Sequence, residues 1–103
     1  MAKLVRDRIP EIIEKNGKKP VTHIADEIEY WDKLKLKLQE EVEEVLEDGT
    51  NDEVKEELAD VLEVINAICE FKKVDKNELE SLRIKKAKER GGFSNKIILE
   101  KVE

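Results

Sequence analysis

Apolar residues recur along this chain with the period of an amphipathic helix, and glycine and proline divide the pattern into helical segments. Residues 26–47 contain neither glycine nor proline, and Gly49 then provides a stop. A second long helix is expected to begin at a cap at Thr50 or Asn51 and to run to about residue 71 or 72. The pattern thus predicts two long helices that a short turn joins.

Two shorter helices and several extended pieces flank this pair. Pro10 can open a short helix over residues 10–16, and Asp75 can cap a last helix over residues 76–90, which a glycine pair stops. The tail NKIILEKVE favours a short strand that pairs with AKLVR or PVTHI. We therefore predict a mainly all-α fold: an antiparallel bundle of about four helices, with short terminal strands, in a single domain over residues 1–103.

The first long helix carries one apolar stripe, and acidic residues lie along its flank. At about 100° per residue, the stripe consists of Ile24, Trp31, Leu34, Leu38, Val42, Val45 and Leu46. Glu41 lies four residues after Lys37 and three before Glu44, so these side chains are helical neighbours. Glu40 lies a little further round. Aromatic residues at helical spacing are typical of a core, which favours core packing of Tyr30 and Trp31 over stacking on a base.

Two carboxylates interrupt the apolar face of the second long helix. Glu57 is in line with Val61 and Val64, and Asp60 is in line with Val64 and Phe71. The rest of that face is formed by Val54, Leu58, Leu62, Ile65, Ile68 and Cys69. Because burial of an unpaired carboxylate is costly, each should be paired, hydrogen-bonded or bound to a metal.

The short turn makes the two long helices antiparallel, which places Glu41 and Glu44 opposite Glu57 and Asp60. Four carboxylates are a hard, oxygen-only ligand set that suits Mg²⁺ or Mn²⁺ and poorly suits zinc. With 26 acidic residues in the chain, one such pair is expected by chance, so the joint arrangement carries the hypothesis. The alternative is a non-catalytic helical dimerisation or interaction module whose acidic rows are solvated.

Composition narrows the classes of partner. A chain of 103 residues buries one modest core, so we expect the bundle to be completed in a homodimer or a larger homo-oligomer. A net charge of −6 argues against binding to duplex nucleic acid, which needs a concentrated basic surface. The single cysteine, Cys69, fits a reducing cytosol. Since the sequence also shows no signal peptide and no membrane span, we expect a cytoplasmic protein without a membrane partner.

Two acidic motifs carry a family resemblance. KLQEEVEEVLED followed by EELADVLEVINAI resembles the all-α nucleoside triphosphate pyrophosphohydrolases, the group of MazG, dimeric dUTPases and phosphoribosyl-ATP pyrophosphohydrolase. The family pattern E-E-x-x-E and then E-x-x-D falls on Glu40, Glu41, Glu44, Glu57 and Asp60. KLVRDRIPEIIEKNGKKP and KKAKERGGFSNKIIL are similar to a subgroup described as phosphoribosyl-ATP pyrophosphohydrolase-like, so the resemblance covers essentially the whole chain.

The resemblance implies hydrolysis between the α and β phosphates of a nucleotide or phosphoribosyl-nucleotide. The products would be pyrophosphate and a nucleoside monophosphate or a phosphoribosyl-AMP-like compound. By position, Glu41, Glu44, Glu57 and Asp60 match the Mg²⁺ ligands, with Mn²⁺ as a substitute. Glu40 and Glu41 match the catalytic positions, and Glu40 would make a further metal contact or orient the attacking water. Compared with dUTPases, the turn between the motifs is short, which argues against a pocket specific for dUTP.

Six further polar residues are candidates for contacting the substrate: Arg6, Arg8, Lys37, Asn66, Lys86 and Arg90. Arg6 and Arg8 precede a helix start, where guanidinium groups can hold phosphate oxygens; the alternative is a surface ion-pair cluster. Lys37 can contact phosphate or pair with Glu41, and pairing is favoured. Asn66 can contact substrate or make a structural hydrogen bond. Lys86 and Arg90 lie four residues apart before the glycine pair. His23 has no partner for nucleophilic catalysis and is interpreted as structural.

Overall fold

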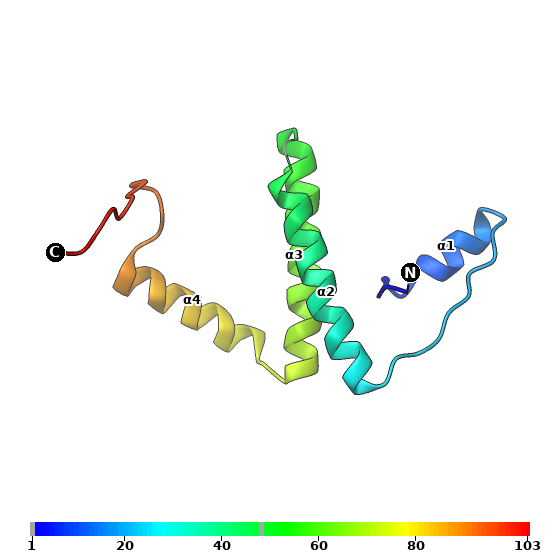
Figure 1. Cartoon of the computed structure of the whole chain (residues 1–103). Coiled ribbons are helices and arrows are strands. Elements are labelled where there is room, and N and C mark those ends of the chain that lie inside the picture. The colour runs from blue at the N-terminus through cyan, green and yellow to red at the C-terminus, as the bar shows by residue number, and fades with distance from the viewer. Residues whose placement is uncertain (1, 48) are drawn as a thin grey trace. The chain divides into compact units, whose positions relative to one another are not determined.

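The computed structural model describes residues 2–47 and 49–103, and within those ranges it contains four helices (Figure 1). They are α1 (Ile9–Lys15), α2 (Glu27–Leu46), α3 (Asn51–Lys72) and α4 (Lys76–Arg90). Each helix begins and ends within about one residue of its predicted segment, so the predicted all-α class is confirmed. The chain divides into two compact units, residues 1–72 and 73–103, which are described separately. A single domain over the whole chain stays a prediction.

Polar caps begin three of the helices, and two of these caps, Thr50 and Asp75, were predicted. The Asp26 carboxylate accepts a hydrogen bond from the backbone N–H of Glu29 at 2.8 Å, and Asp75 caps α4 in the same way. At the start of α3 the cap is Thr50, whose hydroxyl accepts from the N–H of Glu53 at 3.2 Å. A cap of this kind contributes about 1 kcal/mol to the stability of a helix. The helix boundaries are therefore encoded locally.

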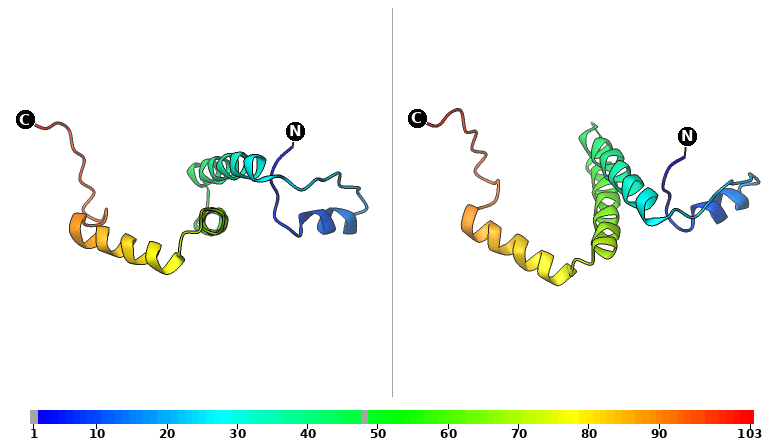
Figure 2. Two further views of the ribbon diagram at one scale, coloured as in Figure 1. Left: turned by 90° about the horizontal axis from the view of Figure 1, so that it is seen from below. Right: turned by 60° about the horizontal axis from the view of Figure 1, so that its bottom comes forward.

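Helices α2 and α3 form a hairpin and lie side by side, running in opposite directions (Figures 1 and 2). Leu34 on α2 and Val64 and Cys69 on α3 are buried between them. At the end of the hairpin away from the turn, Trp31 stacks on Phe71, with ring centroids 5.6 Å apart. Tyr30 meets the same phenyl ring edge-on. The predicted burial of Cys69 is confirmed, whereas Tyr30 and Trp31 are half-buried and pack against Phe71.

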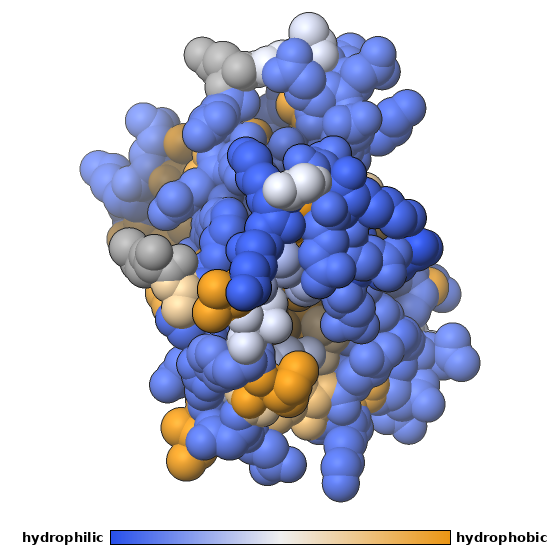
Figure 3. All heavy atoms as spheres, turned by 90° about the vertical axis from the view of Figure 1, so that its right-hand side faces the viewer, coloured by the Kyte–Doolittle hydropathy of each residue, from blue (hydrophilic) through white to orange (hydrophobic). Residues whose placement is uncertain are grey.

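Much of the predicted apolar face stays exposed in one chain. Leu46, predicted on the stripe of α2, is 76% exposed, and Leu62 on α3 is 64% exposed. The prediction for Ile24 is wrong, because this residue lies in the extended segment before α2 and is 96% exposed. One face of the molecule shows apolar side chains scattered among charged ones (Figure 3). The physical reason is that two helices cover only one side of each other. Completion of the bundle by a second copy stays a prediction.

The predicted terminal strands are wrong: across residues 2–47 and 49–103 the structure contains no β-strand. The tail lies in the second unit, whereas the segments AKLVR and PVTHI lie in the first. The tail residues Ile97, Ile98 and Leu99 are exposed. A strand needs a neighbour for its backbone N–H and C=O groups, and alternation of apolar residues alone does not supply one.

In the second unit α4 is a charged helix without a buried residue. It ends at Gly91, whose φ of +82° is a conformation that glycine adopts without strain. The predicted glycine stop is confirmed here. By contrast, α2 ends at Leu46 because Glu47 is already extended, before Gly49 is reached. Within the described part of the chain, no helix is long and apolar enough to cross a membrane.

Candidate metal centre

Four carboxylates from the α2–α3 hairpin converge on one point. Glu41 and Glu44 come from the last turns of α2, and Glu57 and Asp60 come from the first turns of α3. One oxygen of each carboxylate lies within 4.8 Å of the corresponding oxygens of the other three. The predicted juxtaposition is therefore present, and it follows from the antiparallel packing of the two helices. We call these four side chains the acidic cluster.

Two carboxylate oxygens of the acidic cluster are buried without a hydrogen-bond partner among the described residues. They are Oε2 of Glu41 and Oε2 of Glu57. Glu41 as a whole is only 7% exposed. A buried acceptor that makes no hydrogen bond costs about 1–3 kcal/mol, and more when it is charged. A cation placed between the two helices would offset this cost, and oxygen ligands of this kind fit Mg²⁺ or Mn²⁺.

Crowding of negative charge changes the acidity of the cluster. Burial raises the pKa of Glu41, a hydrogen bond from Lys37 opposes this, and the charge of Glu44 raises it further. The pKa of Glu44 is also raised, first by its side-chain hydrogen bond with Glu57 and then by burial. Like charges at short range disfavour full ionisation of such a group. A divalent cation would remove that penalty because it favours the ionised form of each ligand.

Lys37 lies beside the acidic cluster and makes the ion pair with Glu41 that the sequence favours. Its Nζ is 3.3 Å from Oε1 of Glu41 and 3.5 Å from Oε2 of Glu40. The predicted pair with Glu41 is confirmed. Glu40 borders the cluster, and its Oε1 is also 3.9 Å from Nζ of Lys3. The motif residue Glu40 is thus half-exposed between two lysines, next to the four convergent carboxylates.

The two arginines that precede α1 have different ion-pair partners. Nη2 of Arg6 lies 2.6 Å from Oδ1 of Asp60, so Arg6 reaches the acidic cluster. Arg8 instead pairs with Glu11 of α1, at 2.9 Å from its Nε and 2.8 Å from its Nη2. For Arg8 the surface ion pair is the observed arrangement. Only one of the two guanidinium groups is therefore placed where a phosphate at the cluster could meet it.

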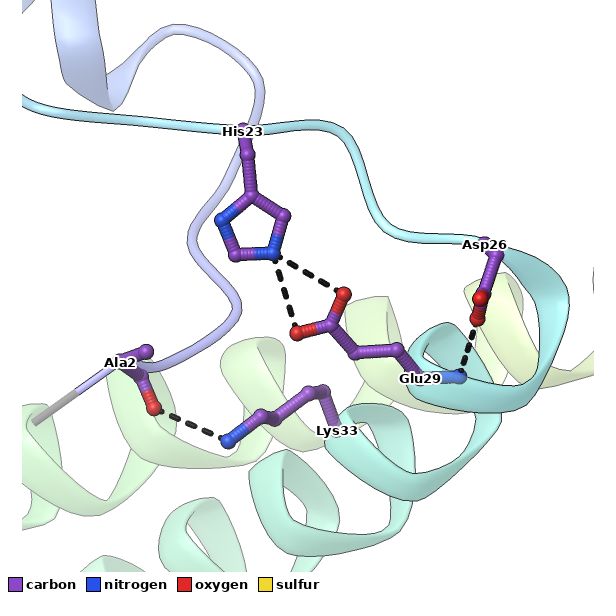
Figure 4. A network of polar contacts seen from close by, with 5 residues as sticks. All are labelled: Ala2, His23, Asp26, Glu29 and Lys33. Atoms are coloured by element: carbon purple, nitrogen blue, oxygen red, sulfur yellow. Dashed lines mark hydrogen bonds and ion pairs between the residues drawn. The ribbon is translucent and has the colours of Figure 1, made fainter.

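Polar contacts hold the segment around Arg6 on the hairpin (Figure 4). We call residues 2–8 the N-terminal arm. Lys33 of α2 donates a hydrogen bond to the carbonyl of Ala2 at 3.1 Å. Nε2 of His23, in the extended segment before α2, lies 3.0 Å from both carboxylate oxygens of Glu29. The segments before and after α1 are thus both attached to α2, which fits the structural role predicted for His23.

A cavity of about 120 Å³ opens between the N-terminal arm and the hairpin. Glu41 and Asp60 line it together with Arg6 and Lys37, and Leu34 contributes an apolar wall. Pockets that enclose a whole ligand usually measure about 300 Å³ or more. This cavity is therefore too small to enclose a ligand of nucleotide size by itself.

The other three residues that were predicted to contact the substrate are Asn66, Lys86 and Arg90. Asn66 is half-buried on α3. Lys86 and Arg90 are exposed on α4, which belongs to the second unit. Their role toward a substrate stays a prediction. Sequence reasoning missed the approach of Lys3 to Glu40, because neither the spacing nor the helical phase relates an irregular arm to a residue of α2.

Comparison with known proteins gives one partial similarity. No family model matches the chain, and no solved structure matches it. A curated protein of Mycolicibacterium smegmatis (strain ATCC 700084 / mc(2)155), named only as uncharacterized, is 50% identical over 52 residues. The shared segment is 50% of this chain and 53% of that protein, so the chain spans about half the length of the relative that it matches.

Proposed function

We propose that this protein is a Mg²⁺-dependent nucleotide pyrophosphohydrolase of the all-α, MazG-like family. It would cleave between the α and β phosphates of a nucleotide or phosphoribosyl-nucleotide and release pyrophosphate and a monophosphate. The observation that supports this most is the acidic cluster, in which one oxygen of Glu41 and one of Glu57 are buried without a hydrogen-bond partner among the described residues. An ordinary solvated acidic face would leave those oxygens in water.

The donor set fits the proposed ion. Glu41, Glu44, Glu57 and Asp60 would hold it, because each offers a hard oxygen and the four reach a common point. When bound, Mg²⁺ or Mn²⁺ would supply Lewis acidity that offsets the phosphate charge and makes water a better nucleophile. In phosphoryl transfer, positioning and electrostatic stabilisation carry most of the rate.

The chain's own residues would orient the reactants. Glu40 borders the cluster and is partly exposed, so its carboxylate can accept a hydrogen bond from the attacking water. Lys37 and Arg6 line the cavity and can donate to phosphate oxygens, Arg6 in a planar, two-pronged geometry. Glu41 would combine its ligand role with the orientation of Lys37 through their 3.3 Å pair.

A second candidate function is a non-catalytic helical dimerisation or interaction module. The exposed apolar residues of the hairpin favour association, since Leu46 and Leu62 are both mostly exposed in the single chain. The two candidates share one assembly, a homodimer or a larger homo-oligomer. They differ in whether the acidic cluster binds a divalent ion and supports turnover. For either candidate a reducing cytosol is the proposed location, because Cys69 is a buried free thiol.

The deciding experiment is incubation of the full chain with a panel of canonical and modified nucleotides and Mg²⁺, scored for released pyrophosphate. We expect release from at least one nucleotide, and none after chelation of the metal. A thermal shift on adding Mg²⁺ or Mn²⁺ is the second readout. No pyrophosphate from any nucleotide, together with no thermal shift, would overturn the enzymatic proposal in favour of the interaction module.

A further inference from the structure

The contact between Arg6 and Asp60 joins the N-terminal arm to the acidic cluster. The distance of 2.6 Å is short, as in a charge-assisted hydrogen bond, and both side chains are partly exposed. Asp60 is also one of the four carboxylates that converge at the helix interface. One residue is therefore shared by an ion pair with the arm and by the proposed metal site.

We propose that Arg6 and a divalent ion compete for Asp60, and that binding of the ion turns the Arg6 guanidinium toward a phosphate oxygen of the substrate. This inference rests on the proposed function, because it takes the acidic cluster as a metal site. It adds a specific role for an arm residue: a positioning group that the ion releases to bind the phosphate.

Electrostatic repulsion makes Arg6 and a divalent ion compete for Asp60. Arg6 and a divalent ion are both cations, so holding both on one carboxylate brings like charges together. The guanidinium offers donors only and can never act as a ligand. The unpartnered buried oxygens belong to Glu41 and Glu57, whereas Arg6 donates its hydrogen bond to Asp60. An ion there would draw Asp60 toward those oxygens and weaken its pair with Arg6.

The arm keeps Arg6 near the site after the pair breaks. Lys33 holds the carbonyl of Ala2, and Lys3 lies 3.9 Å from Glu40, and neither contact involves Arg6. Leu4 and Val5 line the same cavity as Glu41 and Asp60. A released guanidinium therefore remains at the wall of the cavity, where a phosphate next to the ion would lie. An arginine suits that task because its planar fork matches two phosphate oxygens.

The test measures Mn²⁺ affinity of the full chain by the electron paramagnetic resonance signal of free Mn²⁺, without nucleotide. Loss of an exposed ion pair is a small effect, so we expect Arg6→Ala to bind Mn²⁺ about two- to fivefold more tightly than wild type. Arg6→Gln, which removes the charge at similar size, should do the same. Lys3→Ala is the matched control, since it removes the same charge from the same arm beside Glu40.

A second measurement follows the released guanidinium. With Mn²⁺ saturating, calorimetry with inorganic pyrophosphate should show about tenfold weaker binding for Arg6→Ala, because a charge-assisted hydrogen bond to phosphate is lost. Lys3→Ala should bind pyrophosphate more tightly than Arg6→Ala does. Circular dichroism of each variant checks that the helices are retained.

Three results would overturn the inference and leave the proposed metal site intact. Weaker Mn²⁺ binding by both Arg6 variants would show that Arg6 positions Asp60 for the ion. Equal tightening by Arg6→Ala and Lys3→Ala would show a general charge effect without competition at Asp60. Unchanged pyrophosphate binding by Arg6→Ala would exclude the phosphate contact. Failure of the wild-type protein to bind Mn²⁺ at all would instead refute the proposed metal site, and this inference with it.

Discussion

Lys37 lies one helical turn before Glu41, with its Nζ 3.3 Å from Oε1, while the other oxygen of Glu41 is buried and unpaired. The two oxygens of one carboxylate therefore face different environments. Lys37 neutralises Oε1, whereas Oε2 is buried and makes no hydrogen bond to the described residues. A divalent ion can therefore bind Glu41 through Oε2 while the pair between Oε1 and Lys37 is kept.

Glu57→Gln should lower pyrophosphate release about 100-fold or more while the helical fold persists. One ligand charge is lost at nearly constant shape, and a 100-fold loss corresponds to about 2.7 kcal/mol of transition-state stabilisation. Initial rates with the nucleotide found in the panel measure the effect. Glu43→Gln, on the exposed side of α2, is the control and should keep the wild-type rate. Full activity of Glu57→Gln would refute its assignment as a ligand.

Removal of metal should make stability depend on pH in a defined direction. The pKa values of Glu41 and Glu44 are raised above the usual 4.5, so the folded protein binds more protons than the unfolded chain between 4.5 and the raised values. By linkage, the free energy of unfolding then falls as pH rises through that window. Melting curves of the chelated protein from pH 4 to pH 8 measure the slope.

Saturating Mn²⁺ should reduce this pH dependence or reverse it, because the ion binds the deprotonated carboxylates. Glu44→Gln supplies the control, since it removes one of the two raised groups and should flatten the profile of the chelated protein. A chelated wild-type protein whose melting temperature rises steadily across the same window would contradict the prediction.

Leu34→Ala should destabilise the protein by about 2–5 kcal/mol, as expected for a truncated core leucine. Leu34 is 1% exposed and lies in the centre of the hairpin interface. Ile28→Ala, in the first turn of the same helix and 78% exposed, should change the free energy of unfolding by less than about 0.5 kcal/mol. Urea unfolding followed by circular dichroism compares the two, and similar losses for both would refute the assigned orientation of α2.

Leu62→Lys should weaken self-association if the exposed side of α3 meets a second copy. Burial of a leucine side chain contributes about 1.5–3 kcal/mol, so the dissociation constant should rise about 10- to 100-fold. Analytical ultracentrifugation over a range of concentrations measures it. Ile97→Lys, in the exposed tail of the second unit, is a control of the same chemistry. A monomeric wild-type protein at all concentrations would remove the basis of this prediction.

Helix boundaries and the acidic cluster could be predicted because both depend on short-range rules. Thr50 and Asp75 mark helix starts through their own capping bonds, and helical phase places Glu57 and Asp60 on one face. Because the turn between α2 and α3 has only a few residues, the two helices must pack antiparallel. The convergence of the cluster follows from these elements without knowledge of any distant contact.

The contacts of the N-terminal arm could not be predicted in the same way. Arg6 and Asp60 are 54 positions apart, and an irregular segment has no period that indicates which way a side chain points. The strand assigned to the tail failed for a related reason, since a strand exists only with a partner. The prediction that Ile24 lies on the apolar stripe of α2 is wrong, because the helix begins only at Glu27. Leu46 does lie in α2, yet it is 76% exposed in one chain.

The attachment of Ala2 to Lys33 has a practical consequence for how the protein is produced. An affinity tag fused ahead of Ala2 would emerge beside the carbonyl that Lys33 holds and next to the lysine that reaches Glu40. Poly-histidine at that position would bring metal-chelating imidazoles close to a site proposed to bind a divalent ion.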